Sequence, residues 1–87
     1  MRSNITLRQL RAFVEVVRSA DFTAAARKLH LTQSATSLLV RELETQVGLQ
    51  LIDRTTRQVA LTEAGQEVLA RAARLLTPAA LALAPPP

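Results

Sequence analysis

The sequence predicts a mainly α-helical fold, with three helices and a two-stranded hairpin followed by a further helix. Three observations support this prediction: two helical segments joined by a two-residue turn, two short β-compatible runs after them, and a last stretch with apolar residues at helical spacing. The 87 residues suit one domain, in which about 60 to 65% of the surface can be buried. Because Phe13 and Phe22 are the only aromatic residues, the core must be aliphatic.

The first helix is predicted to begin after Thr6. Thr6 and Gln9 have the spacing of a capping box, in which each side chain bonds the other residue's backbone N–H. Apolar residues then recur at helical spacing, at Leu7, Leu10, Val14 and Val17, near Phe13. Arg8, near the helix start, is either a phosphate contact or, as we favour, a solubilising surface group.

The next two helices are predicted at about Thr23 to Leu29 and Gln33 to Val47, with His30 and Leu31 as the turn. Three successive alanines in the first of them allow a second helix to cross closely. Thr32 is a good N-cap for the second helix, and Gly48 is well suited to end it. Apolar spacing in the second helix points one stripe at the core, formed by Thr36, Val40, Leu43 and Val47. The Thr36 hydroxyl is expected to bond the Thr32 carbonyl.

The start of that second helix is expected to stand out from the surface. Gln33, Ser34 and Ser37 both donate and accept hydrogen bonds, as the reading of base edges in a major groove requires. After this helix, Leu51 to Arg54 and Gln58 to Leu61 are the two β-compatible runs of a wing. The arginines that flank the connection, Arg54 and Arg57, suit a ribbon lying on phosphates, with Arg57 at the tip able to enter a minor groove. The order of elements predicts a winged helix-turn-helix.

The last helix is predicted from Glu63 to about Leu76 and is opened by Thr62. Its acids lie early and its arginines late, which agrees with the helix dipole, and Glu67 can pair with Arg71. Two adjacent apolar stripes predict a dimer interface: Val68, Ala72 and Leu75 beside Leu69, Ala73 and Leu76. The alternative is that both stripes pack on the chain's own first helix.

Composition excludes several classes of protein. There is no cysteine for a disulfide or thiolate metal site, no metal-ligand spacing and no cofactor motif, and the single histidine, His30, lies in a turn. We therefore expect no enzyme, no metal and no cofactor. The 87 residues show no secretory signal and no membrane-spanning run, so we expect that nothing anchors or exports this chain.

The net charge of +4 is unevenly distributed along the chain. Residues 1–41 hold seven basic and two acidic residues, whereas residues 42–53 hold three acids and no base. This asymmetry would orient the domain on an anionic partner, although ordinary solvated helix faces would give the same pattern.

The residues that carry these features resemble the N-terminal domain of LysR-type transcriptional regulators. The resemblance rests on LRQLRAFVEVVRSADFTAAARKLHLTQSATS, RELETQVGLQLIDRT and RQVALTEAG, and it covers about Thr6 to Leu76 without a gap. It implies a cytoplasmic bacterial regulator that binds double-stranded DNA as a homodimer on an interrupted inverted repeat. It also implies a winged helix-turn-helix over residues 1–62 and a linker and dimerisation helix over 63–77. The uncharged residues that follow, with Pro78 among them, predict that the helix stops there and that residues 78–87 form an apolar, disordered tail, although the family's linker helix continues further. The 87 residues hold no counterpart of the family's ligand-binding domain, so we expect no small-molecule effector to bind to them.

Contacts carried over from the family are assigned residue by residue. Base edges are read by Gln33, Ser34 and Ser37, with Arg57 in the minor groove, and phosphates are held by Thr23, Thr32, Arg41 and Arg54. Thr23 and Thr32 are also expected to be plain N-caps, Arg54 can instead pair with Asp53 or another nearby acid, and Arg41 with Glu44 or Thr45.

Three positions depart from the family pattern. Leu38 replaces a common Arg, Lys or Gln, Ser34 a common Pro, and Thr36 a common aliphatic residue. Leu38 either packs on thymine methyl groups or, as we slightly favour, reads nothing. An exposed leucine there also leaves a second function open, a protein-interaction module that docks through Leu38, Leu39 and the last helix.

Overall fold

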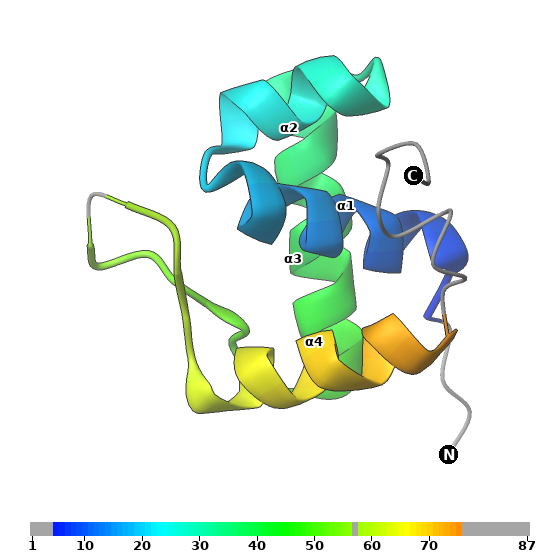
Figure 1. The fold of residues 1–87 in the computed structure, drawn as a ribbon, viewed down its shortest axis with the longest axis vertical. Coiled ribbons are helices and arrows are strands. Elements are labelled where there is room, and N and C mark those ends of the chain that lie inside the picture. Colours follow the sequence, from blue (N-terminus) through cyan, green and yellow to red (C-terminus); the bar gives the residue numbers. More distant parts are fainter. Residues whose placement is uncertain (1–4, 57, 76–87) are drawn as a thin grey trace, which may run out of the picture.

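The computed structural model describes residues 5–56 and 58–75, including four helices and a two-stranded antiparallel sheet (Figure 1). The elements follow the chain as α1 (Leu7–Ser19), α2 (Phe22–Leu29), α3 (Gln33–Val47), β1 (Ile52–Asp53), β2 (Ala60–Leu61) and α4 (Glu63–Leu75). In Figure 1, α1 crosses in front of α3, while α2 and α4 lie toward opposite ends of α3 and the wing projects to one side. The predicted mainly α-helical fold is confirmed.

The start of α1 has the predicted capping box. The Gln9 N–H donates to the Thr6 hydroxyl over 3.1 Å, and the Thr6 N–H donates to Oε1 of Gln9 over 3.0 Å. The apolar stripe is confirmed at Leu10 and Val14, which are buried, but Leu7 is 50% exposed because it lies in the first turn, outside the packed part of the helix. The helix ends at Ser19, and the left-handed backbone of the next residue, Ala20, turns the chain into α2.

The core lies where α1, α3 and the wing meet. Its largest fully buried side chains include Phe13, Val40, Leu43, Leu51 and Ile52, so the core is aliphatic, as expected from the sequence, apart from Phe13. In α2, Ala25 and Ala26 are buried, which agrees with a close helix crossing. Thr36 is also fully buried, and its hydroxyl donates to the Thr32 carbonyl over 2.9 Å, as predicted. The last member of the predicted core stripe, Val47, is half-buried.

The wing is shorter than the sequence suggested. Each strand has two residues, paired as Ile52 with Leu61 and Asp53 with Ala60, although the β-compatible runs each covered four. The reason is that the chain leaves the sheet as soon as it turns. The Asp53 carboxylate accepts from the Thr55 N–H over 2.9 Å, which closes a tight turn directly after the first strand.

The last helix begins as predicted and closes one side of the domain. The Thr62 hydroxyl accepts from the Gly65 N–H over 2.9 Å, and the Thr62 N–H donates to the Leu51 carbonyl over 3.0 Å. The predicted pair of Glu67 and Arg71 is present at 3.7 Å. The helix is described as far as Leu75, and Leu76 and the predicted tail over 78–87 lie outside the described residues.

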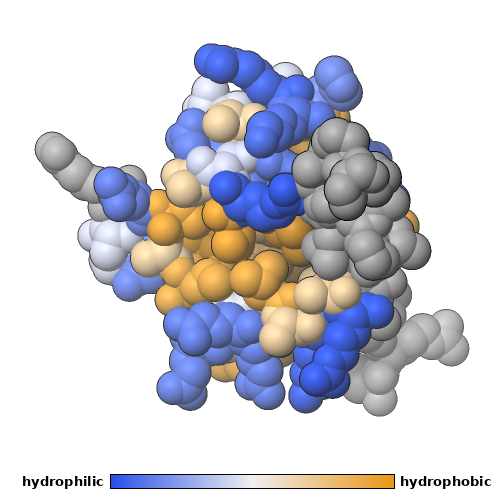
Figure 2. Space-filling view, viewed as in Figure 1, coloured by the Kyte–Doolittle hydropathy of each residue, from blue (hydrophilic) through white to orange (hydrophobic). Residues whose placement is uncertain are grey.

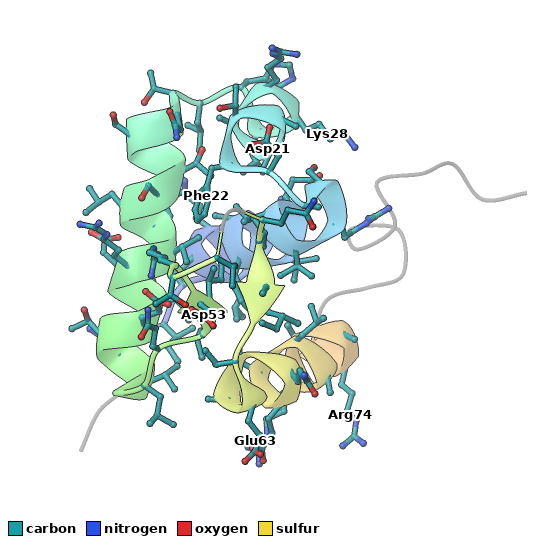
Figure 3. The ribbon with its side chains drawn as sticks, turned by 90° about the vertical axis from the view of Figure 1, so that its left-hand side faces the viewer. Asp21, Phe22, Lys28, Asp53, Glu63 and Arg74 are labelled. Carbon is teal, nitrogen blue, oxygen red and sulfur yellow. The ribbon has the colours of Figure 1, made fainter. Side chains whose placement is uncertain are left out.

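One residue of the expected dimer surface is placed differently. Ala72 is fully buried in the chain's own core, so it cannot contribute surface to a partner, contrary to our expectation. Val68 and Leu69 are half-buried against the same core, whereas Ala73 is exposed. The cause is the crossing of α4 over the core, which turns the Val68–Ala72 stripe inward. Figure 3 shows Glu63 and Arg74 on α4 pointing away from the body of the domain.

A buried carboxylate joins α1 to the end of α2. Glu15 is 1% exposed; Oε2 accepts from the Ser19 hydroxyl over 2.6 Å and lies 3.7 Å from Nζ of Lys28, while Oε1 has no hydrogen-bond partner. The Lys28 side chain is 62% exposed and stays hydrated. The ion pair therefore recovers little of the cost of burying Glu15.

Glu15→Met is expected to raise the free energy of unfolding by about 1 kcal/mol, because an apolar side chain of similar size removes the desolvation cost. Lys28→Met should act in the opposite direction, since it leaves the carboxylate buried without its cation. Urea denaturation of the two variants and the wild type gives the comparison, and a Glu15→Met protein less stable than the wild type would contradict the prediction.

Candidate nucleic-acid interface

The connection between α2 and α3 is held by backbone bonds that leave it little freedom. His30 ends α2 in the left-handed conformation, with φ 58°, and the Leu31 N–H donates to the Ala26 carbonyl over 2.9 Å. The Thr32 hydroxyl then accepts from the Ala35 N–H over 3.0 Å, which confirms Thr32 as the N-cap of α3. His30 is exposed, in agreement with its expected place in the turn. The turn therefore fixes the start of α3 relative to α2.

The first turns of α3 gather the predicted reading residues on one open surface. Gln33 and Ser34 are exposed, Ser37 is partly exposed, and Leu38 is 56% exposed. With Arg41 these residues line an open groove of about 490 Å³. The other side of the same helix faces the core and carries the buried Val40 and Leu43. The helix thus presents a polar edge with one leucine while its other side is anchored in the core.

Arg41 borders the reading residues and makes no ion pair with any of the described residues. The guanidinium of Arg41 does not pair with Glu44 or Thr45, the alternative partners predicted for it. Glu44 pairs with Arg54 instead, and the Thr45 hydroxyl donates to the backbone carbonyl of Arg41 over 3.0 Å. The guanidinium of Arg41 is therefore available to an anion beside the start of α3.

Arg54, at the beginning of the wing, has partners within the chain. Its Nη1 lies 2.9 Å from Oε1 of Glu44, so the alternative of a nearby acid is confirmed, with Glu44 and not Asp53 as the acid. The guanidinium also lies over the ring of Phe22, 5.9 Å from its centroid. These bonds use Nη1, and the remaining donors can still reach a phosphate.

Arg57, predicted to lie at the wing tip, is outside the described residues. Earlier in the wing, the Asp53 carboxylate accepts hydrogen bonds from both the hydroxyl and the N–H of Thr55. These bonds lower the pKa of Asp53, and the bond from the Thr55 hydroxyl has the larger effect. Asp53 is therefore an anion at neutral pH. The stability from this turn is present above the ordinary pKa of Asp53 and is lost as the pH falls through the lowered value.

Thr23 is not the N-cap that we expected. Asp21 caps α2, and its carboxylate accepts from the Ala24 N–H over 2.9 Å, so the helix begins at Phe22 and Thr23 is its exposed second residue. The sequence carried the signal, since Asp directly before a helical run is a good cap. Sequence reasoning also missed the role of Glu44, whose partners lie seven to ten residues further along the chain.

No group of three or more potential metal ligands is found in residues 5–56 and 58–75. Within the same ranges, no helix is long and apolar enough to cross a membrane.

A tightly turned helix pair, a protruding second helix and a following hairpin define this protein as a winged helix-turn-helix domain. Residues 7–66 match the family described as "Bacterial regulatory helix-turn-helix protein, lysR family". The chain belongs to this family, as its resemblance to LysR-type regulators predicted.

Relatives of known name agree with this assignment. The chain is 52% identical over 65 residues to the RuBisCO operon transcriptional regulator of Allochromatium vinosum, covering 75% of this chain and 22% of that protein. It is 48% identical over 73 residues to the HTH-type transcriptional regulator YfeR of Shigella flexneri, covering 84% of this chain and 24% of that protein. The chain thus spans less than a quarter of the length of these relatives. Among solved structures, the BenM DNA-binding domain in complex with catB site 1 DNA is similar, with a TM-score of 0.77, 40% identity, and coverage of 80% of this chain and 79% of that chain.

Proposed function

We propose that this chain binds double-stranded DNA sequence-specifically, as the DNA-binding part of a LysR-type transcriptional regulator. One observation carries the proposal: the start of α3 is anchored on its inner side and exposes Gln33, Ser34 and Ser37 together on its outer side, next to Arg41. An exposed helix of this kind fits a major groove, and side chains that donate and accept hydrogen bonds can distinguish base pairs there. The similar BenM domain, solved with DNA, supports this proposal. Its working compartment is then the cytoplasm.

The proposed contacts fall into two groups. Gln33, Ser34 and Ser37 read base edges, Leu38 faces the same groove without a hydrogen bond to offer, and Arg57 reaches a minor groove from the wing. Phosphates are held by Thr32 at the start of α3, by Thr23 early in α2, by Arg41 in α3 and by Arg54 directly after β1. The phosphate contacts position the domain, and the base contacts select the sequence.

Two copies of the chain are proposed to bind together through α4. Apolar surface is exposed on the face between α1 and α4 (Figure 2), and this supports a partner there. Because Ala72 is buried, the proposed contact uses Val68, Leu69 and Ala73, together with Leu75 and Leu76. Two reading helices related by a two-fold axis would match an interrupted inverted repeat.

A second candidate function is a protein-interaction module. Leu38 is 56% exposed on the reading face, and an exposed leucine is more typical of a protein contact than of a base contact. The other leucine assigned to this function, Leu39, is half-buried against the core and offers less surface. DNA binding therefore has the stronger support.

Selection of random duplex DNA by the 87-residue chain, followed by mass measurement of the complex, tests the proposal. The expected result is an enriched inverted repeat that holds two chains. Absence of binding even at low salt would refute the DNA-binding proposal, and an enriched site that holds one chain would refute the proposed dimer.

Ser37→Ala is expected to change base preference at one position of each half-site and to weaken binding to the preferred duplex about fivefold, because a hydroxyl contact to a base edge is lost. Thr45→Ala removes a hydroxyl from the other end of the same helix and should change neither. Binding to duplexes that vary at single positions measures both effects. Identical preferences for Ser37→Ala and the wild type would show that Ser37 reads no base.

A further inference from the structure

The carboxylate of Glu44 connects α3 to the first residues of the wing. Its Oε2 accepts from the backbone N–H groups of Leu51 and Ile52, over 2.8 and 3.1 Å. The side chain is 11% exposed, so most of it is removed from water. Hydrogen bonds from amides to an ionised acceptor are stronger than bonds between neutral groups, particularly at low exposure.

The same carboxylate also holds Arg54. Nη1 of Arg54 donates to both oxygens of Glu44, over 2.9 and 3.2 Å, and the guanidinium lies over the ring of Phe22 from α2. Figure 3 shows Phe22 beside α3 on the side where Asp53 of β1 lies. One acid therefore ties α3 to the wing and, through Arg54, to α2.

The wing needs such support because its own sheet is minimal. Each strand has two residues, and a two-stranded hairpin is marginally stable in water even when it is longer. Besides the sheet itself, the hydrogen bonds described for Leu51 and Ile52 come from Thr62, directly before α4, and from Glu44. Of these, Glu44 alone bonds the wing directly to the helix that carries the reading residues.

We propose that Glu44 is a positioning residue for DNA recognition, which sets the place of the wing relative to α3 and orients Arg54 toward the backbone of the bound duplex. This inference rests on the proposed function. According to this proposal, Glu44 increases the affinity for DNA, although its negative charge alone would decrease it. Loss of a negative charge ordinarily strengthens binding to DNA, whereas loss of the Glu44 carboxylate should weaken it.

Glu44→Gln is compared with Glu42→Gln in the complete chain. Both changes remove one negative charge from α3 and keep the side-chain size; Glu42 is exposed and its one described partner, Nε2 of Gln9 at 3.4 Å, can still be bonded by an amide. Each protein is titrated with two duplexes. One is the full selected site, and the other has the same half-sites trimmed of the flanking base pairs that the wing would reach.

On the full duplex, Glu44→Gln is expected to bind about tenfold more weakly than the wild type, and Glu42→Gln as tightly or slightly more tightly. On the trimmed duplex, the wild type itself should bind more weakly, and the difference between the wild type and Glu44→Gln should fall to about twofold or less. Equal losses on both duplexes would mean that Glu44 only stabilises the fold, and tighter binding by Glu44→Gln would mean that only its charge matters. Either result would overturn the proposal.

Hydrogen exchange, measured without DNA, separates this inference from the proposed function. In Glu44→Gln the amides of Leu51 and Ile52 should exchange about tenfold faster, while the amide of Thr36, bonded to Thr32 at the distant end of α3, should keep its rate. Unchanged exchange at Leu51 and Ile52 would overturn the inference, whatever the DNA result. If the wild type bound neither duplex, the proposed function would fail, and the exchange rates would still decide whether Glu44 holds the wing.

Discussion

Gly65→Ala is expected to lower the free energy of unfolding by about 3 kcal/mol or more, because the first turn of α4 lies directly on the chain that enters the wing. A Cβ at this position would stand 2.1 Å from the Leu51 carbonyl oxygen and 3.0 Å from Cδ2 of Leu61. The carbonyl cannot move away easily, since it accepts from the Thr62 N–H and belongs to a residue that is fully buried. The added methyl group must therefore displace the whole start of α4.

Gly48→Ala provides the control for this substitution. Gly48 has φ +83°, and a Cβ there would meet nothing within 4 Å. Its replacement should cost only about 1 kcal/mol, for the left-handed backbone. Urea denaturation followed by circular dichroism measures both variants. Equal losses at the two glycines would show that α4 can shift without cost and would contradict the close contact with Leu51.

Raising the salt from about 50 to about 200 mM is expected to weaken binding to the selected duplex about 10³-fold. Three arginines per chain, Arg41, Arg54 and Arg57, are proposed to face DNA, which makes six cations in a dimer. Each releases nearly one counterion, so the logarithm of the affinity should fall with the logarithm of salt with a slope of about −5.

Arg41→Gln is the matched test of this slope, because Arg41 makes no ion pair with the described residues and its loss should leave the fold intact. The variant should flatten the slope by about two in a dimer, and it should weaken binding to all sequences about equally. A partner bound with no salt dependence would favour apolar docking through Leu38 and the protein-interaction function.

Local features of the fold could be predicted from sequence because their partners are near in the chain. The capping box of Thr6 and Gln9, the N-cap at Thr32 and the ends of α3 each depend on residues no more than four positions apart. The gathering of Gln33, Ser34 and Ser37 on one surface follows from helical periodicity alone. The residues that form this surface could therefore be predicted from the sequence.

Features that depend on how elements pack could not be predicted in the same way. The place of Ala72 in the core follows from the angle at which α4 crosses, and both apolar stripes of that helix looked equally suited to a partner. Arg54 could have paired with the adjacent Asp53, but Asp53 is engaged by Thr55 and the guanidinium lies closer to Glu44. Such choices between partners are settled by tertiary geometry and not by spacing.

Leu51 uses both of its backbone groups to join separate elements, with its N–H bonded to Glu44 of α3 and its carbonyl bonded to Thr62 at the start of α4. These two hydrogen bonds connect α3 to the start of α4 through one buried residue, and they restrict the movement of one helix relative to the other. In the proposed dimer, the winged helix-turn-helix of each chain would then move as a rigid body with its own α4. The separation between two half-sites that a pair of chains can span would be decided where the two copies of α4 meet, and a regulator of this design would adjust that separation by changing the angle between those helices.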